Sequence, residues 1–312
     1  MKDTVRIAVV VGPTAAGKTE IGIKLAQELE GEIISVDSMQ IYRWMNIGTA
    51  KPTPELLSLV PHHLIDILNP DEIYNAGRFV ADADGIIKKL SQEKKTIILV
   101  GGTNLYIRAL INGIIEVPEI SEEVRSSVRS LAAESGVCAC YEKLKTLDPK
   151  SAEKLHPNDI SRISRALEVI LETGTSIQEM QSHHGFRQKR YIVKYICATW
   201  PREEIYDRIN RRVHLMVDEG LIEETQKLLE MGYTEDLPSL NSIGYRQTVA
   251  YLKQQITKDE MIADIQQKSR RYAKKQLTWY KKHNQVHQLE RNNLSKSDLA
   301  AVREFMNHRL FQ

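Results

Sequence analysis

Residues 12–19, with the sequence GPTAAGKT, constrain the fold of this chain more than any other segment. They match G-x-x-x-x-G-K-S/T, the pattern of a phosphate-binding loop. The apolar run at 7–11 predicts a buried strand before the loop, and Ile21, Leu25 and Leu29 have the spacing of an amphipathic helix after it. A glycine turn without a ligand is the alternative. Strand, loop and helix in this order are, however, the context that the motif requires.

The residues of this loop are suited to holding phosphate groups. Glycines let the backbone curl so that its N–H groups face phosphate oxygens, and the N-terminus of the following helix adds partial positive charge. Lys18 supplies a full charge, and the Thr19 hydroxyl can ligate Mg²⁺. We expect a bound di- or triphosphate, which the loop alone does not identify. The expected binding residues are Gly12, Thr14, Ala15, Ala16, Gly17, Lys18 and Thr19.

The composition is that of an ordinary globular protein. Its 312 residues suggest about two domains, or one domain with an insertion, and 42% of them are hydrophobic. No apolar stretch approaches the ~20 residues that span a bilayer, and the first strand begins too early for a signal peptide. Three cysteines, Cys138, Cys140 and Cys197, are too few for a disulfide framework and are expected to be reduced thiols of a cytoplasmic protein.

Alternating strand and helix patterns predict an α/β core. The expected strands are 7–11, 32–36 and 96–100. Helical patterns such as 76–90 lie between them, so the strands should be parallel and joined by crossover helices. The strands end at Gly12, Asp37 and the glycine pair 101–102. Because ligands bind outside the carboxyl ends of such strands, these positions should line one cleft.

The pattern changes after Pro118. The expected helices are 121–135, 139–147 and 159–173, with no strand between them. A strand expected at 191–199 returns to the sheet, so we predict a mainly helical insertion at 118–190. The remainder, 1–117 and 191–312, should form a P-loop NTPase-like parallel sheet core with a helical C-terminal region.

The region beyond Pro201 is expected to be helical and locally basic, with a capping box at Thr257 and Glu260 opening a long helix. Its basic residues are Lys268, Arg270, Arg271, Lys274, Lys275, Lys281 and Lys282, and a second cluster is Arg187, Lys189, Arg190 and Lys194. These clusters suit a polyanion larger than one nucleotide, and solvated helix faces are an equal alternative. Tyr272, Trp279 and Tyr280 are interleaved with the long helix's cluster and suit stacking on exposed bases, although at least one should pack against the protein.

Asp37 is the candidate for acid–base chemistry, because it is the acidic residue at a strand end beside the loop. It could act as a general base, hold Mg²⁺, or cap the next turn. The third strand ends in Gly101-Gly102-Thr103 without an acidic residue, which leaves the usual metal-binding position vacant and favours Asp37. The two glycines favour a close approach of ligand to backbone over a simple tight turn.

Arginines and histidines give weaker signals. Arg208, Arg211 and Arg212 crowd one predicted helix, and an arginine aimed into the cleft would neutralise charge on a departing phosphate group. Each is otherwise a surface residue. His62-His63 has no partner at metal-ligand spacing, so a structural pair is favoured over a metal site.

Together these motifs resemble the bacterial tRNA dimethylallyltransferases, also called tRNA isopentenyltransferases, over nearly the whole length. The segments that carry the resemblance are 12–19, 37–42 (DSMQIY), 61–66 (PHHLID), 101–106 (GGTNLY), 156–159 (HPND) with Arg162 and Arg165, 242–247 (SIGYRQ) and 271–280. The second and fourth at this spacing are specific, whereas the first is shared by many nucleotide enzymes. Ala16 stands where the family usually has serine, which changes little because backbone groups make the phosphate contacts.

The resemblance implies a reaction and its partners. The N6 amine of adenosine 37, next to the anticodon of tRNA, attacks C1 of dimethylallyl diphosphate, and diphosphate leaves. The loop would then hold a prenyl diphosphate and not ATP. Mg²⁺ is the implied cofactor, the anticodon stem-loop is the implied contact region, and a cytoplasmic monomer is expected. A small-molecule P-loop kinase, an AMP or ADP isopentenyltransferase and an RNA-binding ATPase remain as alternatives.

The resemblance also implies roles for individual residues. Asp37 would be the base, and Thr19 with its metal and Arg212 would stabilise the leaving group. The implied tRNA contacts are Asp37, Ser38, Met39, Gln40, Thr103, Arg125, Ser161, Arg162, Ile163, Ser164, Arg165, Asn241, Ser242, Ile243, Gly244, Tyr245 and Arg246, and the basic cluster adds Lys274 and Lys275.

Overall fold

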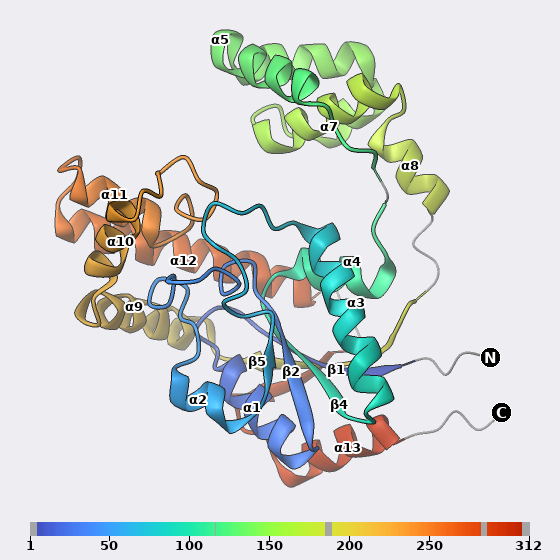
Figure 1. Ribbon diagram of the computed structural model, residues 1–312, viewed down its shortest axis with the longest axis vertical. Helices are drawn as coiled ribbons and strands as arrows, with labels where there is room; N and C mark the ends of the chain where they lie inside the picture. Colours follow the sequence, from blue (N-terminus) through green and yellow to red (C-terminus); the bar gives the residue numbers. More distant parts are fainter. Residues whose placement is uncertain (1–4, 116, 185–188, 282–285, 308–312) are drawn as a thin grey trace. The chain divides into compact units, whose positions relative to one another are not determined.

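The computed structural model describes residues 5–115, 117–184, 189–281 and 286–307. The chain divides into two compact units (Figure 1). One unit contains 1–111 and 190–312, and the other contains 112–189. The structure therefore places the first boundary at 112, where helix α4 (Asn104–Asn112) ends, whereas the sequence pattern placed it at 118.

The first unit is built on a six-stranded sheet with the order β3-β2-β4-β1-β5-β6. The strands are β1 (Arg6–Val11), β2 (Gly31–Val36), β3 (His62–His63), β4 (Thr96–Gly101), β5 (Ile192–Thr199) and β6 (Val286–Glu290). Each neighbouring pair is parallel, as the alternating pattern predicted. The expectation of helix alone beyond Pro201 is wrong at β6, which pairs with β5 at the edge of the sheet.

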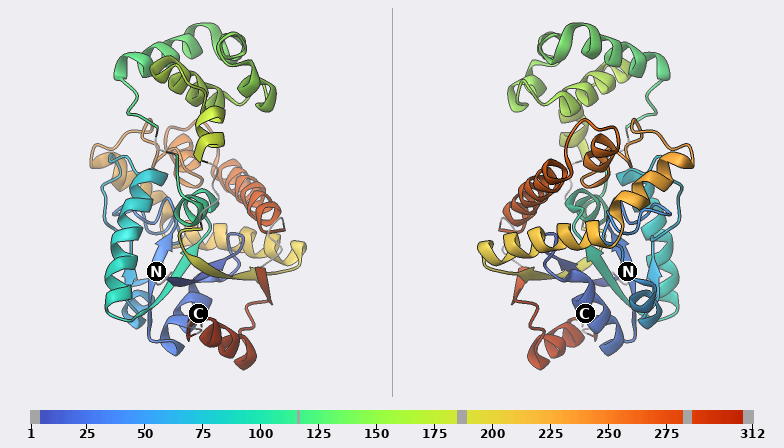
Figure 2. Two further views of the ribbon diagram at one scale, coloured as in Figure 1. Left: turned by 90° about the vertical axis from the view of Figure 1, so that its right-hand side faces the viewer. Right: turned by 90° about the vertical axis from the view of Figure 1, so that its left-hand side faces the viewer.

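Nine helices complete the described part of this unit. They are α1 (Lys18–Glu28), α2 (Pro54–Leu59), α3 (Ala76–Gln92), α4, α9 (Arg202–Asp218), α10 (Leu221–Glu230), α11 (Tyr245–Leu252), α12 (Lys258–Lys281) and α13 (Lys296–Asn307). In both views of Figure 2, α1 and α13 lie on one side of the sheet and α9 and α12 on the other. The strands β1, β2 and β4 are buried along nearly their whole length, because helices cover both faces of a parallel sheet.

The short strand β3 explains the histidine pair. His62 and His63 pair with Ile33 and Ile34 of β2. The ring of His62 bonds to the Val60 carbonyl at 2.8 Å, and His63 Nε2 lies 2.7 Å from Glu32 Oε2. The described residues contain no group of three or more His, Cys, Asp or Glu side chains that could hold a metal. Both histidine rings thus have partners within the protein at the edge of the sheet.

The second unit is helical. Its helices are α5 (Glu122–Leu147), α6 (Pro149–Lys154), α7 (Ile160–Thr173) and α8 (Ile177–His184). Val128, Cys140, Leu144, Ile163 and Leu167 form the centre of its own apolar core. This core is separate from that of the sheet, so the insertion has the packing of an independent domain.

Two helix ends in this unit follow from the sequence. Gly136 has φ 76° and ψ 178°, which interrupts α5 at the gap between the two helices expected there. Asp159 caps α7 by accepting a hydrogen bond from the Arg162 backbone N–H at 3.2 Å, and Gly174 ends it with φ 68°. Helix α8 lies in a polar stretch that carried no clear periodicity and was not predicted.

The three cysteines are free thiols. They are Cys138, Cys140 and Cys197, and the last two are buried. In the part of the chain that the structure describes, every helix is too short or too polar to cross a bilayer.

Candidate active site

The backbone of the phosphate loop between β1 and α1 has positive φ angles at several residues. Gly12, Ala15 and Gly17 have φ values of 148°, 63° and 83°. A Cβ atom at Gly12 would lie 2.8 Å from the Ala198 carbonyl oxygen, and one at Gly17 would lie 1.8 Å from Asn292 Nδ2. Both glycines are thus required by positive φ and by close neighbours.

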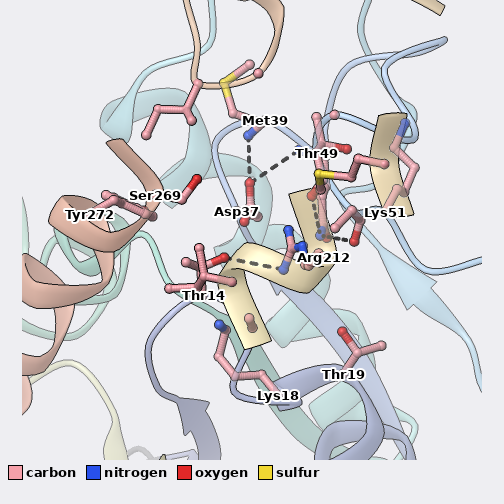
Figure 3. A pocket seen from close by; sticks show the side chains of 18 of the residues that line it. Thr14, Lys18, Thr19, Asp37, Met39, Thr49, Lys51, Arg212, Ser269 and Tyr272 are labelled. Carbon is pink, nitrogen blue, oxygen red and sulfur yellow. Dashed lines mark hydrogen bonds between the residues drawn. The ribbon is translucent and has the colours of Figure 1, made fainter. Parts of the chain in front are cut away.

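A cavity of about 790 Å³ opens beside this loop, within the unit that contains the sheet. Lys18 and Thr19 line it from the start of α1, Asp37 from the end of β2, Arg212 from α9 and Tyr272 from α12 (Figure 3). Gly101, at the end of β4, lines it as well. The expected meeting of the strand ends is therefore found for Asp37 and Gly101, whereas Gly12 and Gly102 are not among the residues that line the cavity.

Lys18 and Arg212 both lie near Asp37 in the cavity. Burial lowers the pKa of Lys18 to about 8, with Asp37 acting in the opposite direction, and Lys18 Nζ donates to the Pro13 carbonyl at 2.9 Å. Burial also lowers the pKa of Arg212, again opposed by Asp37. Arg212 Nη1 donates to Thr14 Oγ1 at 3.3 Å. These two partly desolvated cations favour the binding of an anion, because Asp37 compensates their charge only in part.

Asp37 has a backbone partner and also faces the cavity. Its Oδ1 accepts hydrogen bonds from the Met39 N–H at 2.9 Å and the Gln40 N–H at 3.3 Å, so it does cap the turn. The Ser38 N–H donates to Thr103 Oγ1 at 3.1 Å, which ties this turn to the segment after β4. The turn therefore holds the carboxylate at a fixed place in the cavity wall.

Two N–H groups of the loop already have partners within the protein. The Thr14 N–H donates to Gln276 Oε1 at 2.8 Å, and the Ala16 N–H donates to the Pro13 carbonyl of the same loop at 3.3 Å. Both N–H groups were expected to face a phosphate, and in this conformation both are already engaged. Of the expected set, Ala15, Gly17, Lys18 and Thr19 keep N–H groups at the N-terminal end of α1, where a helix offers unpaired donors.

The loop carbonyls are held by side chains of α9, of α12 and of the segment between β5 and α9. Arg208 Nε donates to the Ala15 carbonyl at 2.8 Å and Trp200 Nε1 to the Ala16 carbonyl at 3.1 Å. The buried Tyr280 donates its hydroxyl to the Gly12 carbonyl at 3.5 Å. Tyr280 is thus one aromatic residue of the basic helix that packs against the protein, and the ring of Trp279 lies 6.5 Å from that of Tyr195, centroid to centroid.

The glycine pair after β4 is explained by packing. A Cβ atom at Gly101 would lie 2.1 Å from the Val36 carbonyl oxygen, and one at Gly102 would lie 2.3 Å from Gln276 Nε2. The favoured interpretation, close approach of a ligand, is therefore unnecessary for either glycine. Neighbouring strand β2 and helix α12 already require both.

Residues 241–246 divide into two groups. Asn241, Ser242, Ile243 and Gly244 line the cavity, and Arg246 is exposed. Tyr245 is fully buried and donates its hydroxyl to Glu224 Oε1 at 2.6 Å. The expected RNA contact of the Tyr245 side chain is therefore corrected, because its ring lies inside the protein.

The expected RNA residues of the helical unit divide in the same way. Arg162 is exposed and pairs with Asp159 at 3.2 Å, and Arg165 pairs with Glu168 at 3.3 Å, with nearly half of its side chain exposed. Ser161 is exposed, and Arg125 and Ser164 are half-buried. Ile163 is fully buried in the core of this unit, so its side chain is not available to an RNA.

The basic cluster on α12 has an exposed part and a structural part. Lys274 and Lys275 are exposed. Arg270 Nη1 donates to Asn210 Oδ1 of α9 at 2.5 Å, so this arginine joins the two helices. Arg187 and Lys282 lie outside the described residues.

Three side chains at or beside the cavity were not predicted from the sequence. Ser269 and Lys51 line it, and Gln276 lies behind Thr14. Lys51 Nζ donates to the Tyr42 carbonyl at 2.7 Å and to Asn46 Oδ1 at 2.8 Å, and it pairs with Asp66. No local motif marks these residues, because their partners are distant in sequence or belong to an irregular loop.

Sequence comparisons show the family to which the chain belongs. A family model described as IPP transferase matches residues 40–283. A tRNA dimethylallyltransferase 2 of Geotalea uraniireducens (strain Rf4) is 44% identical over 289 residues, which cover 93% of each chain. A tRNA dimethylallyltransferase of Alkaliphilus oremlandii (strain OhILAs) is 42% identical over 307 residues, covering 97% of this chain and 98% of the relative.

Solved structures give the same result. The full-length tRNA isopentenylpyrophosphate transferase of Bacillus halodurans matches with a TM-score of 0.70 and 39% identity, covering 96% of this chain and 95% of that chain. A eukaryotic dimethylallyltransferase acting on tRNA matches with a TM-score of 0.80 and 25% identity, covering 96% and 77%.

Proposed function

The chain belongs to the IPP transferase family, and we propose that it is a tRNA dimethylallyltransferase. It transfers the dimethylallyl group of dimethylallyl diphosphate to N6 of adenosine 37 beside the anticodon and releases diphosphate. One observation carries this proposal: Lys18, Arg212 and Asp37 face a single cavity at the phosphate loop. Cations for a leaving diphosphate and a carboxylate for an incoming amine are thereby close to one another.

The cationic side of the cavity stabilises the leaving group. As the bond between C1 and the diphosphate oxygen breaks, negative charge grows on that oxygen and its phosphate. Lys18, Arg212 and the N–H groups at the start of α1 are already in place around this position. Donors that are held in place before the reaction stabilise the growing charge without further reorganisation.

The donor atoms beside the loop fit a magnesium ion. Thr19 contributes a hydroxyl and Asp37 a carboxylate to the same cavity wall. Mg²⁺ prefers such oxygen ligands and completes its shell with substrate phosphates and water. Thr19 would hold the ion, with Asp37 as a second or water-mediated ligand. When bound, Mg²⁺ would neutralise part of the charge of the diphosphate.

Asp37 orients and deprotonates the amine. The N6 nitrogen forms a bond to C1 while the bond from C1 to diphosphate breaks, and the nitrogen loses one proton to the Asp37 carboxylate. An exocyclic amine is a weak nucleophile, so correct placement of the reactants supplies much of the rate enhancement. The adenine must leave its stack to enter the cavity, which costs a few kcal/mol that contacts elsewhere offset.

Exposed basic and polar residues supply those contacts. Lys274 and Lys275 of α12, with Arg125, Arg162 and Arg165 of the insertion, are suited to the phosphates of an anticodon stem-loop. Ser38, Met39 and Gln40 with the 241–244 turn line the cavity and are suited to the adenine itself. We also propose that the protein acts as a monomer in the cytoplasm.

Two alternatives use the same loop. A small-molecule kinase needs an acidic residue to hold Mg²⁺, and the usual place after β4 has Gly101, Gly102 and Thr103 instead. A transferase that acts on free AMP has no use for a helical insertion or a basic helix. Neither alternative accounts for the exposed arginines and lysines outside the cavity.

Mass analysis of the acceptor separates these functions. The protein is incubated with Mg²⁺, dimethylallyl diphosphate and an anticodon stem-loop RNA, in parallel with ATP and with AMP as acceptor. We expect one five-carbon unit on the RNA and none on an RNA with inosine at position 37, which lacks the N6 amine. A gain of phosphate from ATP, or equal transfer to AMP, would contradict the proposal.

A further inference from the structure

Gln276 is a buried amide with both of its polar atoms engaged. Only 3% of the residue is exposed. Its Oε1 accepts a hydrogen bond from the Thr14 N–H at 2.8 Å, and its Nε2 donates to the Gly102 carbonyl at 3.1 Å. One side chain of α12 therefore joins the phosphate loop to the segment after β4.

Of two neighbouring residues, Gly102 accommodates this amide and Tyr272 shares its hydrogen-bond acceptor. A Cβ atom at Gly102 would lie 2.3 Å from Gln276 Nε2, so the glycine leaves the space that the amide fills. Tyr272, one helical turn earlier on α12, directs its hydroxyl to the same Gly102 carbonyl at 3.4 Å. Two side chains of the basic helix thus converge on one carbonyl beside the cavity.

Thr14 is held from the opposite side as well. Its Oγ1 accepts a hydrogen bond from Arg212 Nη1 of α9 at 3.3 Å. The backbone of Thr14 is fixed by α12 and its side chain by α9. The phosphate loop is therefore held at Thr14 by two helices, α9 and α12, which lie in the carboxyl-terminal part of the chain.

We propose that Gln276 is a positioning residue for the diphosphate site. It does not contact the diphosphate, because both amide atoms are used within the protein. It acts through Thr14, whose fixed backbone sets the direction of the loop that continues into Lys18. Without the amide, the Thr14 N–H and the Gly102 carbonyl lose their partners, and the loop must rearrange to hydrate them. A loop that is not held in its binding conformation binds more weakly. This inference rests on the proposed function of the same site.

Two substitutions test the role. Gln276→Met keeps the length and volume of the side chain and removes both hydrogen bonds. Gln276→Glu keeps the acceptor for Thr14 but loses the donor to Gly102 while the carboxyl is ionised, and regains it when the carboxyl is protonated. Burial favours the protonated form, so it should be reached at mildly acidic pH.

The measurement is the affinity for inorganic diphosphate with Mg²⁺, from calorimetry at pH 5.5, 6.5 and 7.5, without RNA. We expect Gln276→Met to bind about tenfold more weakly than the unsubstituted protein at each pH. The Gln276→Glu variant should be equally weak at pH 7.5 and approach the unsubstituted protein at pH 5.5. The ionisable groups around the bridge are Lys18, Arg212, Tyr272 and Asp37, and they are common to all three proteins, so ratios at each pH isolate the substitution.

The outcomes are distinguishable from those of the proposed function. If the unsubstituted protein does not bind diphosphate, the proposed function fails. If it binds and Gln276→Met binds within twofold of it, the inference fails. Equal weakness of both variants at every pH would also overturn it, because a general loss of structure does not respond to protonation of one carboxyl. The melting temperatures of the variants, measured alongside, show whether they are folded.

Discussion

Asp37 combines a backbone role with an electrostatic role, and the two can be separated. Its Oδ1 caps the turn through the Met39 and Gln40 N–H groups, while its charge acts on Lys18 and Arg212. An asparagine at this position would keep an oxygen acceptor for the turn and remove the charge. The informative substitution is therefore Asp37→Asn and not Asp37→Ala.

We expect Asp37→Asn to lower kcat for prenyl transfer by about 10²- to 10⁴-fold, the usual cost of losing a general base. Diphosphate affinity measured without Mg²⁺ should be unchanged or higher, because a carboxylate beside the anion is gone. Single-turnover kinetics and calorimetry measure the two effects. Asp236→Asn, at an exposed position that does not line the cavity, is the control and should change neither. Unchanged turnover in Asp37→Asn would remove this residue as the base.

Lys18 makes diphosphate binding depend on pH. Burial lowers its pKa to about 8, so the ammonium is charged below that pH and loses its proton as the pH rises through it. Affinity should therefore fall above pH 8. Between pH 7 and 9 we expect about a tenfold loss relative to a Lys18→Arg variant, because arginine stays charged over this range. Calorimetry at each pH gives the ratio, and parallel profiles in the two proteins would contradict the assignment.

At the scale of elements, α12 has two faces with different functions. Its inner face carries Gln276 and Tyr280, which contact the phosphate loop, and its outer face carries the exposed Lys274 and Lys275. The helix therefore joins the diphosphate site to the surface proposed for RNA. Substitutions on the two faces should change different binding constants.

The variant Lys274→Glu/Lys275→Glu should weaken binding of the anticodon stem-loop and spare diphosphate. Each lost phosphate contact lowers the salt dependence of binding, so the slope of log K against log salt should fall by roughly 1.5 to 2. Fluorescence anisotropy over a salt series measures it. The matched control is Lys88→Glu/Lys89→Glu on α3, whose side chains are also exposed. An unchanged slope would place the RNA elsewhere.

Glu224 of α10 anchors the loop formed by residues 42–51. The carboxylate accepts hydrogen bonds from the N–H groups of Asn46, Ile47 and Gly48 and from the buried hydroxyl of Tyr245. The loop continues into residues 48–53, which line the cavity. Glu224 thus fixes a cavity wall from outside it.

Tyr245→Phe should lower the free energy of unfolding by about 2 kcal/mol, because it removes the hydrogen bond that a buried hydroxyl donates to a charged carboxylate. Urea denaturation measures the change. Tyr251→Phe on the same helix α11 is the control, because no hydrogen bond of its hydroxyl is seen among the described residues, and it should cost little. Equal stabilities of the two variants would show that the bond to Glu224 contributes nothing.

A structural feature could be predicted from the sequence when the residues that produce it are close together in the chain. The strand, loop and helix around Lys18 and the break in α5 at Gly136 follow from local sequence, and both were predicted. The strand β3 has two residues and exists only because β2 lies beside it. The contact of Gln276 with Thr14 spans 262 positions, and no periodicity signals such a contact.

Packing contacts also explain why the side chains of two buried residues were expected to contact RNA. Ile163 and Tyr245 lie in segments that resemble RNA-binding motifs, but each segment also needs residues that pack. Ile163 belongs to the apolar stripe of α7, a signal already present in the sequence. Tyr245 lies beside Gly48, whose Cβ would be 2.5 Å from its ring, and this pairing is visible only in three dimensions.

At the scale of the molecule, the helical insertion leaves and re-enters the core at one place. The Arg190 N–H donates to the Ile111 carbonyl at 2.9 Å, and Arg190 Nη1 donates to the Leu110 carbonyl at 3.2 Å. Arg190 also pairs with Asp84, which accepts a hydrogen bond from the Tyr191 hydroxyl at 2.6 Å. The two ends of the insertion are therefore adjacent, the arrangement in which domain insertions are tolerated.

We expect the core to survive without the insertion. Replacing 112–189 with a short glycine linker should leave diphosphate affinity within about threefold of the full chain, because every residue of the cavity is in the core. Transfer to the anticodon stem-loop should fall at least about a hundredfold, since the arginines of the insertion are lost. Calorimetry and mass analysis measure the two properties. Full transfer activity in the shortened protein would show that the insertion has no part in RNA binding.

The contacts of the phosphate loop also constrain the order in which the molecule can be completed. Residues 12–17 leave the ribosome long before Gln276 and Tyr280, which hold them in place. A growing chain that has not yet reached these two positions has the glycine motif but lacks the side chains that fix its shape. Competence to bind diphosphate must therefore arise only after Gln276 and Tyr280 have been translated, although Thr14 precedes Gln276 by 262 positions.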